Sequence, residues 1–250
     1  MYSTRYILIF VVILTSVVAI ALTGIREATA EKAAQNEDIF NKRAILAAVS
    51  DFLPDGKTVD DLSDQDVLRI FEEKVTQYVL DMEGEVIEGL KAEDIDMAKE
   101  RKKPEPERRL PLYVYEQDGK VYYIVSVRGN GLWDEIWGNV ALKEDLNTIA
   151  GASFDHKGET PGLGAEIKDN PAFPAQFKGK EIYDEGEFVS VTVRKGGARD
   201  PEHEVDGISG ATVTADGVTE MLYRGIKYYE PYFEDLRSNS QQGMLIQAED

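Results

Sequence analysis

The sequence predicts an α+β protein, in which a single N-terminal transmembrane helix precedes an antiparallel sheet domain with packed helices. Three observations support this prediction. Residues 6–25 form an apolar run without a charged side chain. From Leu110 onward, segments rich in β-branched and aromatic residues alternate with turn residues. Near the C-terminus, residues 214–229 place apolar side chains at the spacing of one helix face.

The apolar run of residues 6–25 has the length of a membrane span, because a helix of this length is about 30 Å long. The alternative is a cleaved signal peptide, with Arg5 as its basic region and Ala28-Thr29-Ala30 as its cleavage site. The run is longer than the usual hydrophobic region of a signal peptide, which favours an uncleaved anchor. Nearly all of the chain then lies on one side of the membrane, but counting Lys and Arg does not decide which side.

Residues 26–110 are expected to form a membrane-proximal α/β region and a linker. A helix is predicted up to about residue 50, and a second helix is predicted to begin after the N-cap Ser63. Tyr78–Leu80 and Val86–Ile87 indicate a hairpin. The charged segment 91–109, with two prolines, indicates a solvated helix and linker. The full division is residues 1–5 (N-terminus), 6–25 (transmembrane helix), 26–110, 111–235 (sheet domain) and 236–250 (polar tail).

The sheet domain is expected to begin with a hairpin around Asp118-Gly119, a pair that favours a type I′ turn. Pro231 is expected to kink or end the final helix, and the polar residues from Ser238 predict a mobile tail. The strands predicted for this domain are residues 112–115, 121–127, 136–142, 148–154 and 188–194.

Composition excludes several functions. The 250 residues include 47 acidic and 28 basic side chains, no cysteine and two histidines, for a formal charge of −19. Without cysteine there is no disulfide, thiol nucleophile or cysteine-held cluster, and two distant histidines give no reason to expect a metal site. An acidic chain does not bind nucleic acid through counterion release, so we expect no nucleic-acid partner. The acidic excess is interpreted mainly as a solvated surface.

The stretch from Asp206 to Thr212, DGISGAT, is a glycine-rich turn that opens the final helix. Backbone N–H groups at a helix N-terminus favour a phosphate, and small residues let the backbone approach it. An ordinary capped turn fits the same composition. A nucleophile elbow is excluded because Ala211 stands where it needs Gly and no His follows His203. The Gly-Lys-Ser/Thr of a P-loop is absent as well.

Two further motifs precede this turn. Residues 156–164, HKGETPGLG, lack the third glycine of a dinucleotide fingerprint and also fit an ordinary Pro-Gly loop. In residues 128–133, RGNGLW, Trp133 is either a core residue or an exposed ring that stacks on a planar ligand. No acid–base pair or nucleophile stands out, so we expect no catalytic residue in this chain.

Together the three motifs resemble the C subunit of the Na⁺-translocating NADH:quinone reductases. Residues 206–212 are similar to the flavinylation signal Asp-x-x-Ser/Thr-Gly-Ala-Thr/Ser, which is matched completely, and residues 159–164 and 128–133 are similar to other blocks of that family in the same order. The paralogous flavoprotein of the ferredoxin:NAD⁺ (Rnf) complexes, their G subunit, shares the anchor, the flavinylation signal and the 159–164 block. The Gly-Leu-Trp block and the substantial 26–110 region favour the quinone reductase. A flavin-free, membrane-anchored assembly module of the same fold is the third interpretation.

The resemblance implies a covalent-FMN electron-transfer subunit without complete activity alone, whose residues 111–235 form the FMN-binding domain. Thr212 would hold FMN through a phosphoester bond made by a flavin transferase. Ser209, Gly210 and Ala211 would shape the phosphate cradle. The remaining residues that the resemblance assigns to the flavin site are Asp206, Glu159, Thr160, Leu163 and Trp133. It further implies a single-pass protein of the bacterial inner membrane, largely periplasmic, which relays electrons to quinone reduction coupled to Na⁺ export with the other subunits of a respiratory complex.

Overall fold

A computed structural model describes the backbone of residues 3–247 and the side chains of residues 3–239. The chain forms two units, residues 1–42 and 43–250. The first unit consists of α1 (Thr4–Ala47) as far as Lys42. An 18-residue window of this helix has a mean hydropathy of 2.8, and none of that window is buried in the chain. By length and composition α1 is therefore able to cross a membrane, as the apolar run predicts.

The second unit is built on a five-stranded antiparallel sheet, in which the strands follow one another in sequence order. The β2–β3 turn contains Asp118 and Gly119 with φ of 53° and 75°, the two positive values that a type I′ turn requires. The strands are β1 (Val75–Leu80), β2 (Leu110–Gln117), β3 (Lys120–Asn130), β4 (Glu135–Leu142) and β5 (Ile149–His156).

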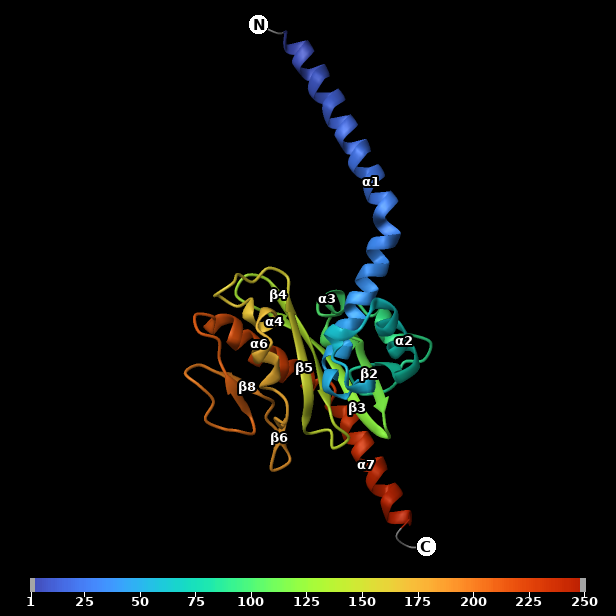
Figure 1. Cartoon of the computed structure of the whole chain (residues 1–250), viewed down its shortest axis with the longest axis vertical. Helices are drawn as coiled ribbons and strands as arrows, with labels where there is room; N and C mark the ends of the chain where they lie inside the picture. The colour runs from blue at the N-terminus through green and yellow to red at the C-terminus, as the bar shows by residue number, and fades with distance from the viewer. Residues whose placement is uncertain (1–2, 248–250) are drawn as a thin grey trace. The chain divides into compact units, whose positions relative to one another are not determined.

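Both faces of the sheet are covered within the second unit, which explains why β2 is buried along most of its length. On one face, Leu112 and Val114 belong to the core that the helix α6 (Thr212–Lys227) completes. On the other, Tyr113 packs edge-on against Phe71 of α2 (Asp64–Lys74), and the Tyr115 hydroxyl donates to the carbonyl of Phe52. Figure 1 shows the sheet between these two layers.

The chain between β5 and α6 wraps the edge of the sheet in short elements, and its aromatic residues Phe173 and Phe177 pack against Phe154 of β5. These elements are α4 (Glu166–Asp169), α5 (Ala172–Ala175), β6 (Tyr183–Asp184), β7 (Glu187–Phe188), β8 (Thr192–Arg194) and β9 (Glu204–Asp206). β6 pairs with β7, and β8 pairs in parallel with β9. After α6 the chain ends in α7 (Glu230–Gln247).

Besides α2 and β1, residues 50–109 contain mostly single helical turns. The Ser63 hydroxyl accepts a hydrogen bond from the Asp66 N–H, which confirms the predicted N-cap. The predicted hairpin forms as well, since Leu80 bridges Val86, but β1 also pairs with β2, which the sequence did not predict. The turns are η1 (Ser50–Phe52), η2 (Pro54–Gly56), η3 (Val59–Asp61), η4 (Ala92–Asp94), α3 (Met97–Glu100) and η5 (Glu105–Glu107).

Three sequence-based expectations differ from the structure. The strand predicted for residues 188–194 is divided between β7 and β8, because Ser190 has a φ of 62° that interrupts the extended run. The segment 91–109 is not simply solvated, because Glu100 is buried and pairs with Lys103 and Arg109. The final helix α6 ends at Lys227, and Pro231 lies in the first turn of α7. The predicted tail is helical as far as Gln247, and residues 248–250 lie outside the described part.

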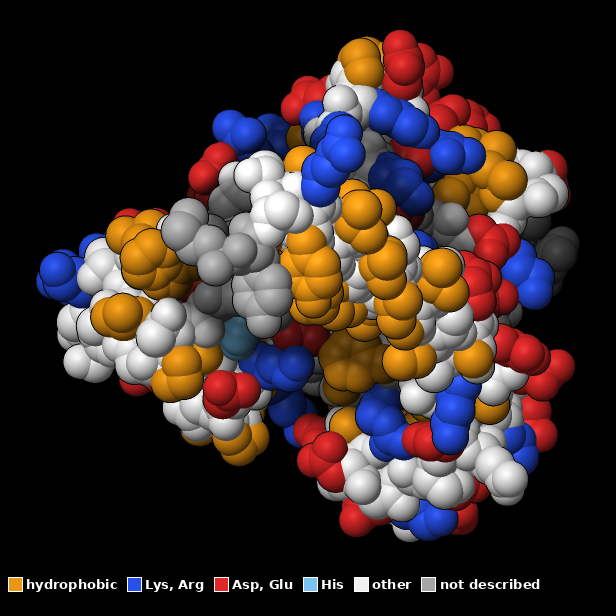
Figure 2. Space-filling model, turned by 90° about the horizontal axis from the view of Figure 1, so that it is seen from above, with side chains coloured by type: hydrophobic (Ala, Val, Ile, Leu, Met, Phe, Trp, Pro, Cys, Tyr) orange, Lys and Arg blue, Asp and Glu red, His pale blue; other side chains and the backbone are white. Residues whose placement is uncertain are grey.

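Acidic side chains spread over much of the surface seen in Figure 2 and are interspersed with basic ones. The formal charge of −19 is therefore not gathered into one acidic patch on this face. This distribution agrees with the interpretation of the acidic excess as a solvated surface.

Candidate functional site

Thr212 is the first residue of α6, and its side chain is exposed. The preceding Ala211 makes no side-chain cap, and no acidic residue lies in the first turn. At this end of α6 the Ala215 N–H donates a hydrogen bond to the Ala211 carbonyl. The N-terminus of this 16-residue helix thus carries backbone donors and a positive dipole end, and none of the residues in its own first turn is acidic, which is an environment suited to a phosphate.

The turn before Thr212 is tight because of Gly210, whose φ is 83°. A Cβ at this position would lie 2.8 Å from the carbonyl oxygen of Gly162, so the turn and the 160–164 loop approach each other closely. Ser209 is exposed beside it. The structure therefore brings the predicted 206–212 and 159–164 motifs together at one helix end.

Glu159 is buried directly behind this helix end. One carboxylate oxygen, Oε2, accepts a hydrogen bond from the Thr214 hydroxyl at 2.8 Å. The other, Oε1, accepts from the backbone N–H of Trp133 at 2.9 Å and, at 3.4 Å, from that of Asp134. A single carboxylate thus joins α6, the loop after β3 and the loop after β5, which are the three predicted motifs.

Burial alone would raise the pKa of Glu159, but the hydrogen bonds from the Trp133 N–H and the Thr214 hydroxyl outweigh it, so the pKa lies below its ordinary value. The carboxylate is therefore ionised at neutral pH. Its side chain is buried, and both carboxylate oxygens accept hydrogen bonds from the protein itself. In the described structure the Glu159 carboxylate holds the loops of the site together, and its assignment to the flavin site stays a prediction.

Two glycines make room for this carboxylate. A Cβ on Gly131 would lie 2.5 Å from Oε1 of Glu159, and a Cβ on Gly164 would lie 2.7 Å from its Oε2 and 2.4 Å from the Thr214 hydroxyl oxygen. Gly164 also has a φ of 145°, which L side chains rarely adopt. These contacts explain why both motifs contain glycine at these positions.

Glu166, which lies outside the sequence motifs, and His156, the first residue of the 156–164 motif, hold the same loops. The Glu166 carboxylate accepts hydrogen bonds from the backbone N–H groups of Gly162 and Gly164, the second at 3.1 Å. The Glu159 N–H donates to Nδ1 of His156 at 3.1 Å. A carboxylate that follows a glycine-rich loop within four residues was the available signal for Glu166.

Four large apolar side chains are exposed around the α6 N-terminus: Leu132, Trp133, Leu163 and Val213. We call them the apolar rim. Trp133 is 65% exposed, so it is a surface residue and not part of the core. The rim is held together because the Trp133 N–H binds Glu159 and the Thr214 hydroxyl also donates to the Leu163 carbonyl at 3.3 Å. Large apolar groups that remain in water beside an open helix end suit a planar, partly apolar ligand.

Thr160 and Asp206, the remaining residues predicted for the flavin site, take part in the hydrogen bonds of the neighbouring loops. Thr160 is exposed, and its carbonyl accepts from the Leu163 N–H at 2.9 Å, which closes the loop. Asp206 ends β9, and its carboxylate accepts from the Ala198 N–H at 2.7 Å. In the described structure both residues shape loops that lead to Thr212.

Asp200, Glu202 and His203 form an acidic group whose possible ligand atoms lie within 4.8 Å of one another. Nδ1 of His203 lies 3.1 Å from the Asp200 carboxylate and Nε2 lies 3.3 Å from the Tyr183 carbonyl oxygen. Although burial opposes it, these two acceptors raise the pKa of His203. Both ring nitrogens already lie within hydrogen-bond distance of a protein oxygen, so this group fits a hydrogen-bonded loop.

The comparisons with known proteins agree with this geometry. Residues 131–227 match the sequence model of the FMN-binding domain. The C subunit of the Na⁺-translocating NADH-quinone reductase of Pseudomonas aeruginosa is 33% identical over 249 residues, which cover 88% of this chain and 90% of that protein. The chain belongs to the C-subunit family of the Na⁺-translocating NADH-quinone reductases. The protein of the same name from Neisseria meningitidis serogroup A is 35% identical over 195 residues, covering 70% of this chain and 75% of that one.

Solved structures of this C-subunit family share the fold. The Parabacteroides distasonis protein superposes with a TM-score of 0.70 at 37% identity, covering 80% of this chain and 94% of that chain. NqrC of Shewanella oneidensis superposes with a TM-score of 0.65 at 28% identity, covering 79% of this chain and 99% of that chain. The predicted α+β class with an antiparallel sheet is confirmed. The chain carries an FMN-binding domain, and its relatives are subunits of an oxidoreductase complex.

The buried Glu159 network predicts an acid-sensitive stability. Replacing Glu159→Gln should lower the free energy of unfolding at pH 7 by about 2 kcal/mol, because charged hydrogen bonds to buried groups are lost. A carboxyl with a lowered pKa stabilises the fold above its ordinary pKa of 4.5, and this stabilisation is lost as the pH falls through the lowered value. The difference between the wild type and the variant should therefore shrink below pH 4.5 in chemical unfolding followed by circular dichroism.

Glu116→Gln, at an exposed position of β2, is the matched control and should change stability little at either pH. Equal stabilities of the Glu159 variant and the wild type at pH 7 would show that the network does not hold the site together.

Proposed function

We propose that this chain is the covalent-FMN electron carrier of a Na⁺-translocating NADH:quinone reductase, with FMN esterified to Thr212. The observation that carries the proposal is the exposed Thr212 hydroxyl at an uncapped helix N-terminus, within the domain that matches the FMN-binding family. The flavin supplies the redox chemistry, since it takes up and releases electrons, and the protein supplies attachment and position.

The residues around Thr212 divide this work. The N–H groups of the first turn of α6, together with Ser209, Gly210 and Ala211, would hold the phosphate. The apolar rim, above all Trp133 and Leu163, would border the ring, and Thr160 and Asp206 would shape the adjoining loops. Glu159 would act through Thr214 and the Trp133 backbone. No catalytic acid or base is required of a carrier, so the subunit alone would have no complete activity.

The proposal includes partners. Attachment requires a flavin transferase, because an uncatalysed threonine hydroxyl is a weak nucleophile at neutral pH. Electrons would come from and go to other subunits of a multi-subunit membrane complex, which couples quinone reduction to Na⁺ export. The likeness to the two curated relatives over most of their length supports this assembly.

Covalent attachment is tested by substitution at the helix end. Thr212→Ala, coexpressed with a flavin transferase, should abolish flavin fluorescence of the chain on a denaturing gel, because only covalent flavin survives denaturation. Thr212→Ser should keep the fluorescence, since the hydroxyl is what is esterified.

Thr214→Ser is the control and should keep the fluorescence. It changes a threonine two residues from Thr212 but retains a hydroxyl for the buried contact with Glu159. Fluorescence that persists in Thr212→Ala would refute attachment at this residue, and a wild type without fluorescence would favour the flavin-free assembly module.

We further propose that α1 is an uncleaved anchor in a bacterial inner membrane, with residues 1–5 in the cytoplasm and the bulk of the chain in the periplasm. The long exposed apolar helix supports this topology. A reporter that is active only after export, fused behind Asp250, should be active. A reporter that is active only in the cytoplasm, fused at the same place, should be silent, and the opposite pair of results would reverse the orientation.

The carrier role is tested in the assembled complex. With Thr212→Ala, oxidation of NADH by an artificial electron acceptor should continue, while quinone reduction and Na⁺ transport should both stop. The reason is that removal of a relay interrupts every later step and none of the earlier ones. Quinone reduction at the normal, Na⁺-dependent rate in this variant would contradict the relay.

A further inference from the structure

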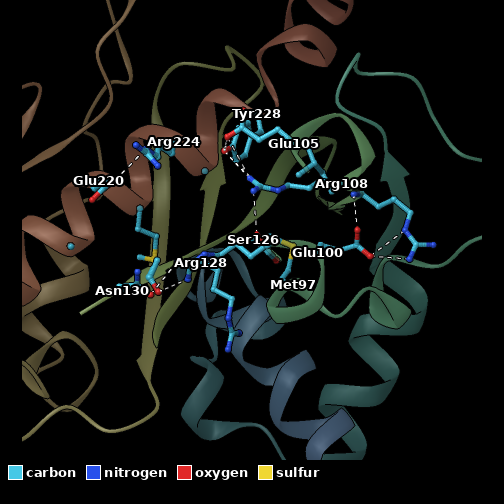
Figure 3. A pocket seen from close by; sticks show the side chains of 17 residues that line it. Met97, Glu100, Glu105, Arg108, Ser126, Arg128, Asn130, Glu220, Arg224 and Tyr228 are labelled. Carbon is cyan, nitrogen blue, oxygen red and sulfur yellow. Dashed lines mark hydrogen bonds and ion pairs between the residues drawn. The ribbon is translucent and has the colours of Figure 1, made fainter. Parts of the chain in front are cut away.

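A separate cavity of about 280 Å³ lies between α6 and residues 97–110, with β3 as its floor. In Figure 3 its walls come from α3 and the following segment on one side and from α6 on the other. Arg101, Arg108 and Arg224 line it from these walls, beside Tyr228 and Glu105. Neither Thr212 nor any residue of the apolar rim lines this cavity.

The guanidinium groups of Arg101 and Arg108 donate to neutral oxygens. Arg101 binds the Gly129 carbonyl at 2.9 Å and the Asn130 amide oxygen at 3.1 Å. Arg108 binds the Tyr228 hydroxyl oxygen at 3.0 Å and two backbone carbonyls. Each has its nearest ion-pair carboxylate at 3.7 Å, which is longer than a charge-assisted hydrogen bond. These acceptors fix the two guanidinium groups without cancelling their charge.

Basic side chains outnumber acidic ones around the cavity, although the whole chain has a formal charge of −19. The buried Glu100 is shared by two cations, Lys103 and Arg109. The basic side chains that line the cavity or pair with its lining are Arg101, Lys103, Arg108, Arg109, Arg128 and Arg224, and the acidic ones are Glu100, Glu105, Glu135 and Glu220.

We propose that this cavity is a binding site for a phosphate-type oxyanion, either inorganic phosphate or the phosphate group of a monoester. The fixed guanidinium groups of Arg101 and Arg108 on one wall, together with Arg224 on the opposite wall, can donate to a tetrahedral oxyanion from different directions. Local positive charge within an acidic protein also concentrates such an anion at this place. The site is distinct from the flavin site and does not depend on the proposed function.

The experiment is isothermal titration calorimetry of the full chain in neutral-detergent micelles at low ionic strength, with inorganic phosphate as the probe. One saturable site per chain is expected, with a dissociation constant near or below about 1 mM. Arg108→Gln should weaken binding about tenfold, because a charged hydrogen bond is lost.

Two exposed positions give a test that does not depend on folding. Arg224→Gln should weaken binding about threefold, since one positive charge is removed from the rim of the cavity. Glu105→Gln should strengthen it by a similar factor, because a negative charge beside Arg108 is removed. Arg69→Gln, on the exposed face of α2, should leave the affinity unchanged.

Further titrations identify the source of the phosphate group. Binding of inorganic phosphate and glycerol phosphate assigns it to a soluble compound, whereas binding only with phosphatidic acid in the micelles assigns it to a lipid headgroup. Failure of all three probes to saturate would overturn the proposal. Equal weakening by the Arg69 and Arg224 substitutions, or weakening by Glu105→Gln, would overturn it as well.

Discussion

The buried carboxylate of Glu159 is the contact on which the rest of the site depends. It joins the first turn of α6 to the loops after β3 and β5 through the Thr214 hydroxyl and the Trp133 N–H. An ionised group is costly to bury unless its hydrogen bonds are complete, so these three segments are bound to one arrangement. The same arrangement leaves Thr212 and the apolar rim facing water. The buried hydrogen bonds of Glu159 thus hold the three segments in the arrangement that leaves Thr212 and the apolar rim exposed.

The sheet fixes where this helix end lies. α6 crosses β3 so closely that a Cβ on Gly217 would lie 2.1 Å from the Asn130 carbonyl oxygen and one on Gly225 would lie 2.6 Å from a Val127 methyl carbon. Gly129 of β3 meets Met221 in the same way. Close contact at both ends of the crossing holds α6 in register with β3. The Asn130–Trp133 loop that leaves β3 therefore arrives beside the first turn of α6.

Local patterns were sufficient for much of this structure. The Asp118-Gly119 turn, the Ser63 cap and the helix that begins at Thr212 all follow from residues adjacent in sequence. Long-range contacts were not predictable in this way, because Glu159 and Thr214 are 55 residues apart and a charged side chain in a loop ordinarily faces solvent. The burial of Glu100 was not predictable for the same reason. Glu100 lies in a charged segment and is buried while paired with Lys103 and Arg109. The break at Ser190 required a backbone angle that composition does not encode.

The proposed electron carrier requires that FMN be attached at the helix end that begins with Thr212. Peptide mapping by mass spectrometry of the chain purified from its native membrane tests this attachment most directly. We predict that the peptide containing Thr212 carries the mass of FMN less one water, and that fragmentation places the added mass on Thr212. An unmodified Thr212 in an active complex, or FMN attached to another residue of this chain, would contradict it.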